Sequence, residues 1–93
     1  MSTIQIEPPE VHQAATTFRQ SAEQSQQLVT RLNSLVNGMD PRWKGMRKQA
    51  FYGKYEEAKA KMLAFVELLN ETARQLDAHA QAIEDADRAG SAH

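Results

Sequence analysis

Two uninterrupted patterns of core-type positions, most of them apolar, constrain the fold of this 93-residue chain more than any other feature. In both, the residues are spaced alternately four and three apart, which is the heptad repeat of an α-helix that packs along one face. No strand-like alternation competes with either pattern. The first comprises Val11, Ala15, Phe18, Ala22, Ser25, Val29, Leu32 and Val36. The second comprises Phe51, Tyr55, Ala58, Met62, Phe65, Leu69, Thr72, Leu76, His79, Ile83 and Ala86.

The first helix is predicted to span about residues 8–37. Pro8 and Pro9 suit the first turn of a helix, where the N–H that proline lacks has no intrahelical partner. Gly38 follows the last apolar residue and favours the left-handed conformation that ends many helices. We therefore expect a turn after residue 37.

The second helix is predicted to span about residues 46–88. Neither glycine nor proline interrupts the chain between Gly53 and Gly90, and good helix formers dominate there. At about 1.5 Å per residue this helix is on the order of 60 Å long. Residues 38–46 form the connecting turn, and residues 89–93 are expected to form a flexible tail.

These elements predict an all-α fold with one domain, an antiparallel hairpin of two long helices. The apolar stripes are wider than a single pair of helices needs, because further apolar residues flank both patterns. A wide stripe suits a helix with two neighbours, so we expect two hairpins to pair into a four-helix-bundle dimer with coiled-coil packing. The flanking residues are Ala14, Leu28, Leu35, Leu63, Val66, Leu68, Ala73 and Ala80. The residues expected in the bundle and dimer packing are Val11, Phe18, Val29, Leu32, Val36, Phe51, Tyr55, Met62, Phe65, Leu69, Leu76 and Ile83.

The first stripe contains mainly small and polar side chains between Ala15 and Ser25. Small side chains allow another helix to approach closely, but the same composition also describes a weakly packed end. The residues alone leave both interpretations open.

Charge is distributed unevenly along the chain, although the net charge is only −1. Residues 40–61 contain seven Lys and Arg against three Asp and Glu, whereas residues 62–93 contain two against six. If two hairpins pack antiparallel, the basic region of one lies beside the acidic region of the other. Such a dimer would dissociate more readily at high salt; the alternative is two separately solvated charge clusters.

The sequence contains no constellation typical of an enzyme or of a metal or cofactor site. It has no cysteine, and its three histidines, His12, His79 and His93, do not have the spacing of a zinc site. Aromatic residues lie among the lysines and arginines of the basic region, a combination that nucleic-acid-binding surfaces also have. However, Phe51 and Tyr55 belong to the apolar pattern, so we expect no nucleic-acid partner.

The only tryptophan, Trp43, lies in the predicted turn. Asp40 and Pro41 favour a short helical turn before it, and Gly45 permits a change of direction after it. Continuing the first heptad pattern beyond Val36 reaches Trp43, which predicts that the indole closes the end of the bundle. An exposed edge of the indole would also be available for recognition.

A helical hairpin of about a hundred residues with Trp-Xaa-Gly at its bend resembles the WXG family of small proteins exported by type VII (ESX) secretion systems. The resemblance extends from the IQIEPPEV start through Trp43, Gly45 and the Ala50-Phe51 pair to Ile83. It implies a non-enzymatic protein that forms a four-helix-bundle homodimer, or a heterodimer with a sister WXG protein. It also implies formation in the cytoplasm, export without a signal peptide, and an extracellular or cell-surface location.

In the family, a C-terminal Tyr-Xaa-Xaa-Xaa-Asp/Glu segment lies near the Trp-Xaa-Gly turn of the partner, and the secretion ATPase recognises the two together. The resemblance assigns Trp43 and Gly45 to this recognition, together with Ile83 and Asp87. Asp87 matches the acidic position, but Ile83 replaces the tyrosine. The resemblance then favours a partner that has the complete signal, with a homodimer using a relaxed signal as the alternative.

Two other functions fit the same residues. A hairpin released from its partner would expose an apolar stripe to a membrane surface, as a membrane-active effector does. A cytosolic helical adaptor that is never exported is the third possibility. The start MSTIQIEPPEV lacks the charged and apolar segments of a signal peptide, so we expect any export to use another route.

Overall fold

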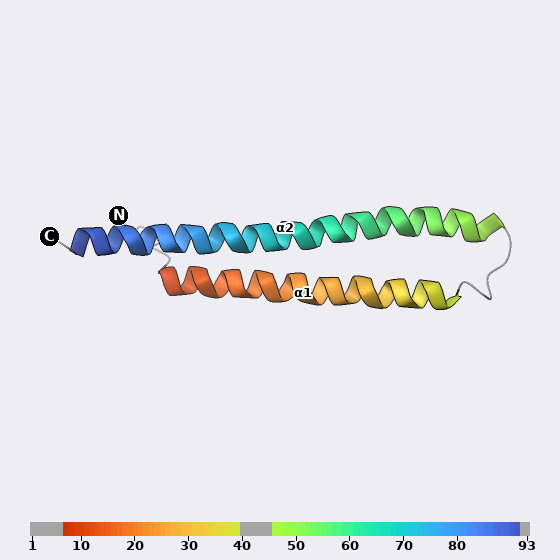
Figure 1. Cartoon of the computed structure of the whole chain (residues 1–93), viewed down its shortest axis with the longest axis horizontal. Coiled ribbons are helices and arrows are strands. Elements are labelled where there is room, and N and C mark those ends of the chain that lie inside the picture. Colours follow the sequence, from red (N-terminus) through yellow and green to blue (C-terminus); the bar gives the residue numbers. More distant parts are fainter. Residues whose placement is uncertain (1–6, 40–45, 92–93) are drawn as a thin grey trace, which may run out of the picture.

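The computed structural model describes residues 7–39 and 46–91, which form two α-helices, α1 (Pro8–Met39) and α2 (Met46–Ser91). The helices lie side by side and antiparallel, in a rod of 74 × 23 × 19 Å (Figure 1). α2 is the longer helix and extends past the start of α1. The prediction of an all-α helical hairpin is confirmed.

Both helices extend beyond the ends expected from the sequence. At the start of α1, the carbonyl of Glu7 accepts hydrogen bonds from the N–H groups of Glu10 and Val11, at 2.9 and 3.2 Å. At its other end α1 includes Gly38, whose backbone stays helical, so this glycine is not the stop. α2 continues to Ser91, so residues 89–91, expected in the tail, are helical.

The face of α1 that packs on α2 follows the first apolar pattern. Val11, Ala15, Ala22, Val29 and Val36 are buried. The remaining members, Phe18, Ser25 and Leu32, are half-buried. This stripe therefore has the phase that the sequence indicates.

The face of α2 that packs on α1 differs from the predicted stripe at every second member. Phe65 is 53% exposed, and Ala58 and His79 are exposed as well. The next residue along the chain points to α1 instead, so Val66 is buried in place of Phe65 and Ala80 in place of His79. The side chains of α2 that contribute to the contact are Tyr52, Tyr55, Lys59, Met62, Val66, Leu69, Ala73, Leu76, Ala80 and Ile83.

Close packing of small side chains explains why α2 takes this phase. Ala15, Ala73 and Ala80 are fully buried, and Ala22 packs with Val66 and Leu69. Because alanine lets helix axes approach closely, the two alanine-containing stripes fit together where larger side chains would not. The small residues near Ala15 therefore serve the close contact between α1 and α2.

Two flanks border this contact, one on each side. We call polar flank the row of residues His12, Arg19, Gln26 and Asn33 of α1 with Glu56, Leu63, Asn70, Asp77 and Glu84 of α2. We call apolar flank the row Ala14, Ser21, Leu28 and Leu35 of α1 with Phe51, Ala58, Phe65, Thr72 and His79 of α2. Each row repeats every seven residues, and in an antiparallel pair equivalent heptad positions of the two helices lie on the same side.

Candidate functional site

Hydrogen bonds join the two helices near both ends of the polar flank. Near the turn, Asn33 Oδ1 accepts from the Tyr55 hydroxyl at 3.3 Å and from Lys59 Nζ at 3.2 Å. One turn away, the Tyr52 hydroxyl donates to the Val36 carbonyl at 3.4 Å. Since Lys59 occupies a heptad position that faces α1, its bond to Asn33 also fixes the register of the helices.

A cluster of charged groups lies at the other end of the polar flank, near the start of α1. His12 Nδ1 lies 2.8 Å from Asp77 Oδ1, and His12 Nε2 lies 3.2 Å from Glu84 Oε1. Arg19 Nη1 donates to the second oxygen of Asp77 at 2.6 Å. We call these four residues the His12 cluster.

The pKa values within the His12 cluster follow from these contacts. The hydrogen bond to Asp77 raises the pKa of His12 above its ordinary value of 6.5, and the negative charge of Glu84 acts in the same direction. Hydrogen bonds from His12 and then Arg19 lower the pKa of Asp77 below its ordinary value of 3.8. The cluster therefore favours charged forms of both groups.

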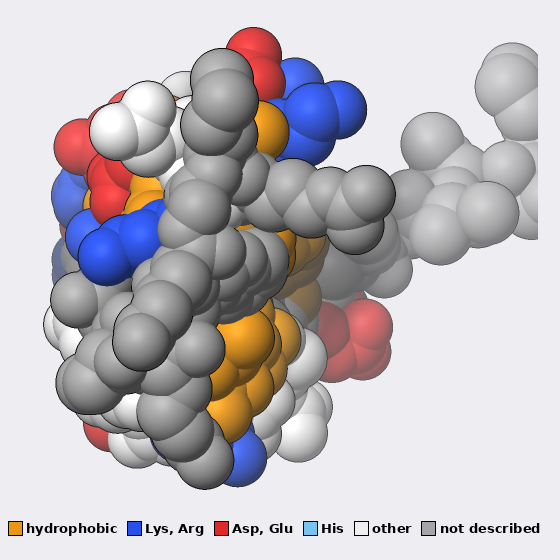
Figure 2. Space-filling view, turned by 90° about the vertical axis from the view of Figure 1, so that its right-hand side faces the viewer, with side chains coloured by type: hydrophobic (Ala, Val, Ile, Leu, Met, Phe, Trp, Pro, Cys, Tyr) orange, Lys and Arg blue, Asp and Glu red, His pale blue; other side chains and the backbone are white. Residues whose placement is uncertain are grey.

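The apolar flank has large hydrophobic side chains in contact with solvent. Leu28 is 47% exposed, Leu35 61% and Phe65 53%. Between the helices runs a groove of about 340 Å³, lined by Ser25, Leu28, Val29, Lys61, Met62 and Phe65. Figure 2 looks along the rod from the turn end, and the largest hydrophobic patch visible there lies at the lower centre, with smaller ones elsewhere. This flank has the character of a surface that packs on another protein.

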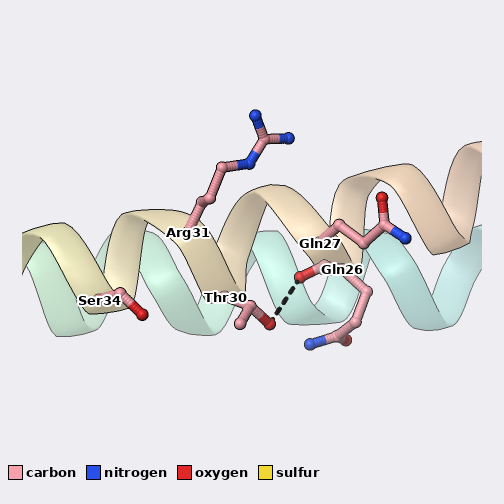
Figure 3. Close-up of a pocket in the computed structure, with 5 residues that line it drawn as sticks. All are labelled: Gln26, Gln27, Thr30, Arg31 and Ser34. Atoms are coloured by element: carbon pink, nitrogen blue, oxygen red, sulfur yellow. Dashed lines mark hydrogen bonds between the residues drawn. The ribbon is translucent and has the colours of Figure 1, made fainter.

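A second groove lies on α1 alone and is polar. It has a volume of about 420 Å³ and is lined by Gln26, Gln27, Thr30, Arg31 and Ser34 (Figure 3). The Thr30 hydroxyl donates to the Gln26 carbonyl at 3.1 Å, so it is engaged within the helix. Side chains from one exposed helix face do not converge on a common point, and the groove offers no arrangement for catalysis.

The predicted export residues are only partly described. Trp43 and Gly45 lie outside the described residues. On α2, Ile83 is half-buried and Asp87, one turn further on, is exposed. At the start of the same helix, Phe51 and Tyr55 stack with ring centroids 6.2 Å apart and an interplanar angle of 7°.

Sequence reasoning missed the His12 cluster. His12 and Asp77 are 65 residues apart in the chain, and His12 and Glu84 are 72 apart. Only the antiparallel register brings them together. A signal exists in retrospect, because each of the three follows a residue of the α1–α2 contact by one position and so falls on the same flank.

Comparison with known proteins decides the family. A model described as proteins of 100 residues with WXG matches residues 3–88. The chain belongs to the WXG100 family. Among its relatives, the protein YukE of Bacillus subtilis strain 168 is 27% identical over 85 residues, covering 91% of this chain and 88% of the relative. The type VII secretion system extracellular protein A of Staphylococcus aureus strain USA300 is 24% identical over 88 residues, covering 95% and 91%.

Solved structures of two similar proteins share the whole hairpin. EsxA of Geobacillus thermodenitrificans superposes with a TM-score of 0.85 at 25% identity, covering 98% of this chain and 99% of that one. The secreted protein EsxB of Bacillus anthracis strain Sterne gives 0.83 at 25% identity, with coverage of 94% and 99%. Proteins of the WXG100 family typically dimerise, and its secreted members are not enzymes.

Residues 7–39 and 46–91 lack two kinds of feature. Neither helix has a stretch long and apolar enough to cross a membrane. Within the same residues, no group of three or more His, Asp or Glu side chains is arranged to hold a metal ion.

Proposed function

We propose that this WXG100 protein is a small non-enzymatic substrate, or co-secreted partner, of a type VII secretion system. It leaves the cell as a folded helical dimer and is extracellular. Family membership supports the proposal, as do two similar proteins, the extracellular protein A of a type VII system in Staphylococcus aureus and the secreted EsxB of Bacillus anthracis.

The open apolar flank is the observation that supports dimerisation most strongly. Leu28, Leu35 and Phe65 are each about half exposed, although side chains of this size contribute about 1.5–3 kcal/mol when fully buried. A second hairpin with a similar flank would cover them and complete a four-helix bundle. The second hairpin is another copy of this chain or a sister WXG protein.

Export recognition is proposed to use two segments, the Trp43–Gly45 turn and residues 83–87 of α2. The secretion ATPase would bind them together when a partner places its own C-terminal segment beside the turn. Ile83 is half-buried and cannot supply the hydroxyl of the family tyrosine. Heterodimerisation with a tyrosine-containing partner is therefore the preferred form of the proposal.

A membrane surface is the competing occupant of the apolar flank. A hairpin separated from its partner would present Leu28, Leu35 and Phe65 to lipid, as interfacial helices do. Leakage of anionic vesicles by the separated hairpin, but not by the dimer, would support this second function.

Secretion of the tagged chain by its own cells tests the first function. We expect the chain in the culture medium when the secretion ATPase is active and its retention when the ATPase is inactive. Asp87→Asn should reduce export if residues 83–87 are read. Glu71→Gln is the matched control, because Glu71 is exposed on the same helix outside residues 83–87 and accepts hydrogen bonds from Arg74. Equal retention with and without an active ATPase would favour a cytosolic adaptor instead.

A further inference from the structure

The geometry around His12 selects one protonation state of its ring. Both ring nitrogens lie within hydrogen-bond distance of a carboxylate oxygen, Nδ1 of Asp77 at 2.8 Å and Nε2 of Glu84 at 3.2 Å. An ionised carboxylate can only accept hydrogen bonds, and a neutral imidazole has only one N–H. The two contacts can both be hydrogen bonds only when His12 is the doubly protonated, positively charged imidazolium.

Loss of that proton would change a balanced cluster into a repulsive one. The charged groups that face His12 are Asp77 and Glu84 from α2, and Arg19 reaches Asp77 from α1 itself. With His12 protonated, two positive charges meet two negative ones. With His12 neutral, one ring nitrogen turns a lone pair towards a carboxylate, and the cluster has a net charge of −1.

The position of the cluster links it to the proposed export segment. Glu84 directly follows Ile83 and lies one turn before Asp87, so its contact with His12 attaches this part of α2 to α1. The side chains of His12, Asp77 and Glu84 are 38, 34 and 35% exposed, which keeps them in contact with the surrounding solution. They lie on the polar flank, opposite the flank proposed for dimerisation.

We propose that the His12 cluster is a pH-operated clasp that controls how firmly the C-terminal part of α2, residues 76–91, is held on α1. Protonated His12 closes the clasp by joining Asp77 and Glu84, and neutral His12 releases Glu84 or Asp77. The link to export rests on the proposed function, because it requires that residues 83–87 are read. The clasp itself rests only on the geometry.

The direction of the pH dependence follows from the two shifted groups. The pKa of His12 is raised above 6.5, so its contribution is complete below 6.5 and is lost as pH rises through the raised value. The pKa of Asp77 is lowered below 3.8, so its contribution is present above 3.8 and is lost as pH falls through the lowered value. The clasp is therefore strongest between these two ordinary values and loosens as pH rises through the raised pKa of His12.

Hydrogen exchange of the purified full-length chain tests the clasp without the secretion system. Protection factors of residues 76–91 are measured at about pH 5.5 and about pH 8, on either side of the ordinary histidine pKa. We expect protection to fall about two- to fivefold at the higher pH, the range typical of partly exposed ion pairs. His12→Gln should remove this pH dependence, whereas Glu71→Gln, at an exposed residue of α2 outside both flanks, should keep it.

Two results would overturn the clasp. One is equal protection of residues 76–91 at both pH values in the unchanged chain, and the other is a pH dependence that survives His12→Gln. Glu84→Gln is a second test in case His12→Gln does not fold. It leaves the histidine in place and should reduce the pH dependence of protection. Failure of export in the secretion assay would disprove the proposed function but would leave these exchange results unchanged.

Discussion

The polar and apolar flanks occupy equivalent places on the hairpin but differ in chemistry. On the polar flank, side chains of α1 and α2 reach across and bind each other, as His12 does with Asp77 and Asn33 with Lys59. On the apolar flank, Leu28 and Phe65 line a groove between the helices and stay about half exposed. One flank is bonded between the two helices, and the other keeps large apolar side chains exposed.

This difference separates two tasks that a two-helix rod must perform. Polar contacts between the helices are directional, so they can fix register and respond to pH. Apolar side chains provide most of the free energy of association, because that energy grows with the area removed from water. A hairpin with two apolar flanks would have no preferred side for its partner.

The largest expected effect comes from placing a charge on each flank in turn. Leu28→Glu should weaken dimerisation by at least about 100-fold, equivalent to about 3 kcal/mol, because it buries an unpaired carboxylate in the interface. Leu63→Glu is the matched control, since Leu63 is 37% exposed on the polar flank and should leave the dimer intact. Sedimentation equilibrium measures both. Equal weakening by the two variants would show that the apolar flank is not the interface.

A smaller effect is expected where α1 and α2 touch. Ala73 is fully buried, so Ala73→Leu should lower the free energy of unfolding by about 1–3 kcal/mol through overpacking. Ala78→Leu, on the exposed side of the same helix, is the control and should change little. Urea unfolding at a fixed protein concentration gives both values. If Ala73→Leu is tolerated as well as the control, the phase of α2 against α1 is wrong.

Asp77→Asn should lower the pKa of His12, because it removes the hydrogen-bonding carboxylate that raises that pKa most. Asp77 lies on the polar flank, away from the proposed interface, so the dissociation constant of the dimer should stay the same. Chemical shifts of the His12 ring, followed by NMR through a pH titration, measure the pKa directly. Ala64→Glu adds a carboxylate on the exposed side of α2, several turns away from Asp77, and serves as the control. An unchanged pKa in Asp77→Asn would contradict the contact.

The smallest expected effect is the salt dependence of a homodimer. If basic residues 40–61 of one hairpin lie beside the acidic second half of α2 of the other, raising salt from about 0.05 to about 0.5 M should weaken association by less than about tenfold. Sedimentation at both concentrations measures this. If association does not change with salt, the two charge clusters are solvated separately. The apolar flank alone would then determine the strength of dimerisation.

Much of the fold could be predicted because it depends on local patterns. The stripe from Val11 to Val36 fixes the buried face of α1, and the prolines at 8 and 9 mark its start. The predicted end at residue 37 was two residues too early, because glycine is permitted in a helix as well as at its stop. Of the candidate site, the Trp43 motif was noticed in the sequence but lies outside the described residues, and the His12 cluster was not predicted.

The sequence by itself determined two amphipathic helices, their hairpin and the family to which they belong. Only the tertiary structure decided which stripe of α2 faces α1, because residues such as Met62 and Leu69 belong to both possible stripes. The choice depended on Ala73 and Ala80, whose small side chains let the helix axes approach. The tertiary structure also decided that His12 contacts Asp77 and Glu84. Contacts across 65 or 72 residues depend on the antiparallel register and cannot be seen in the local periodicity of the sequence.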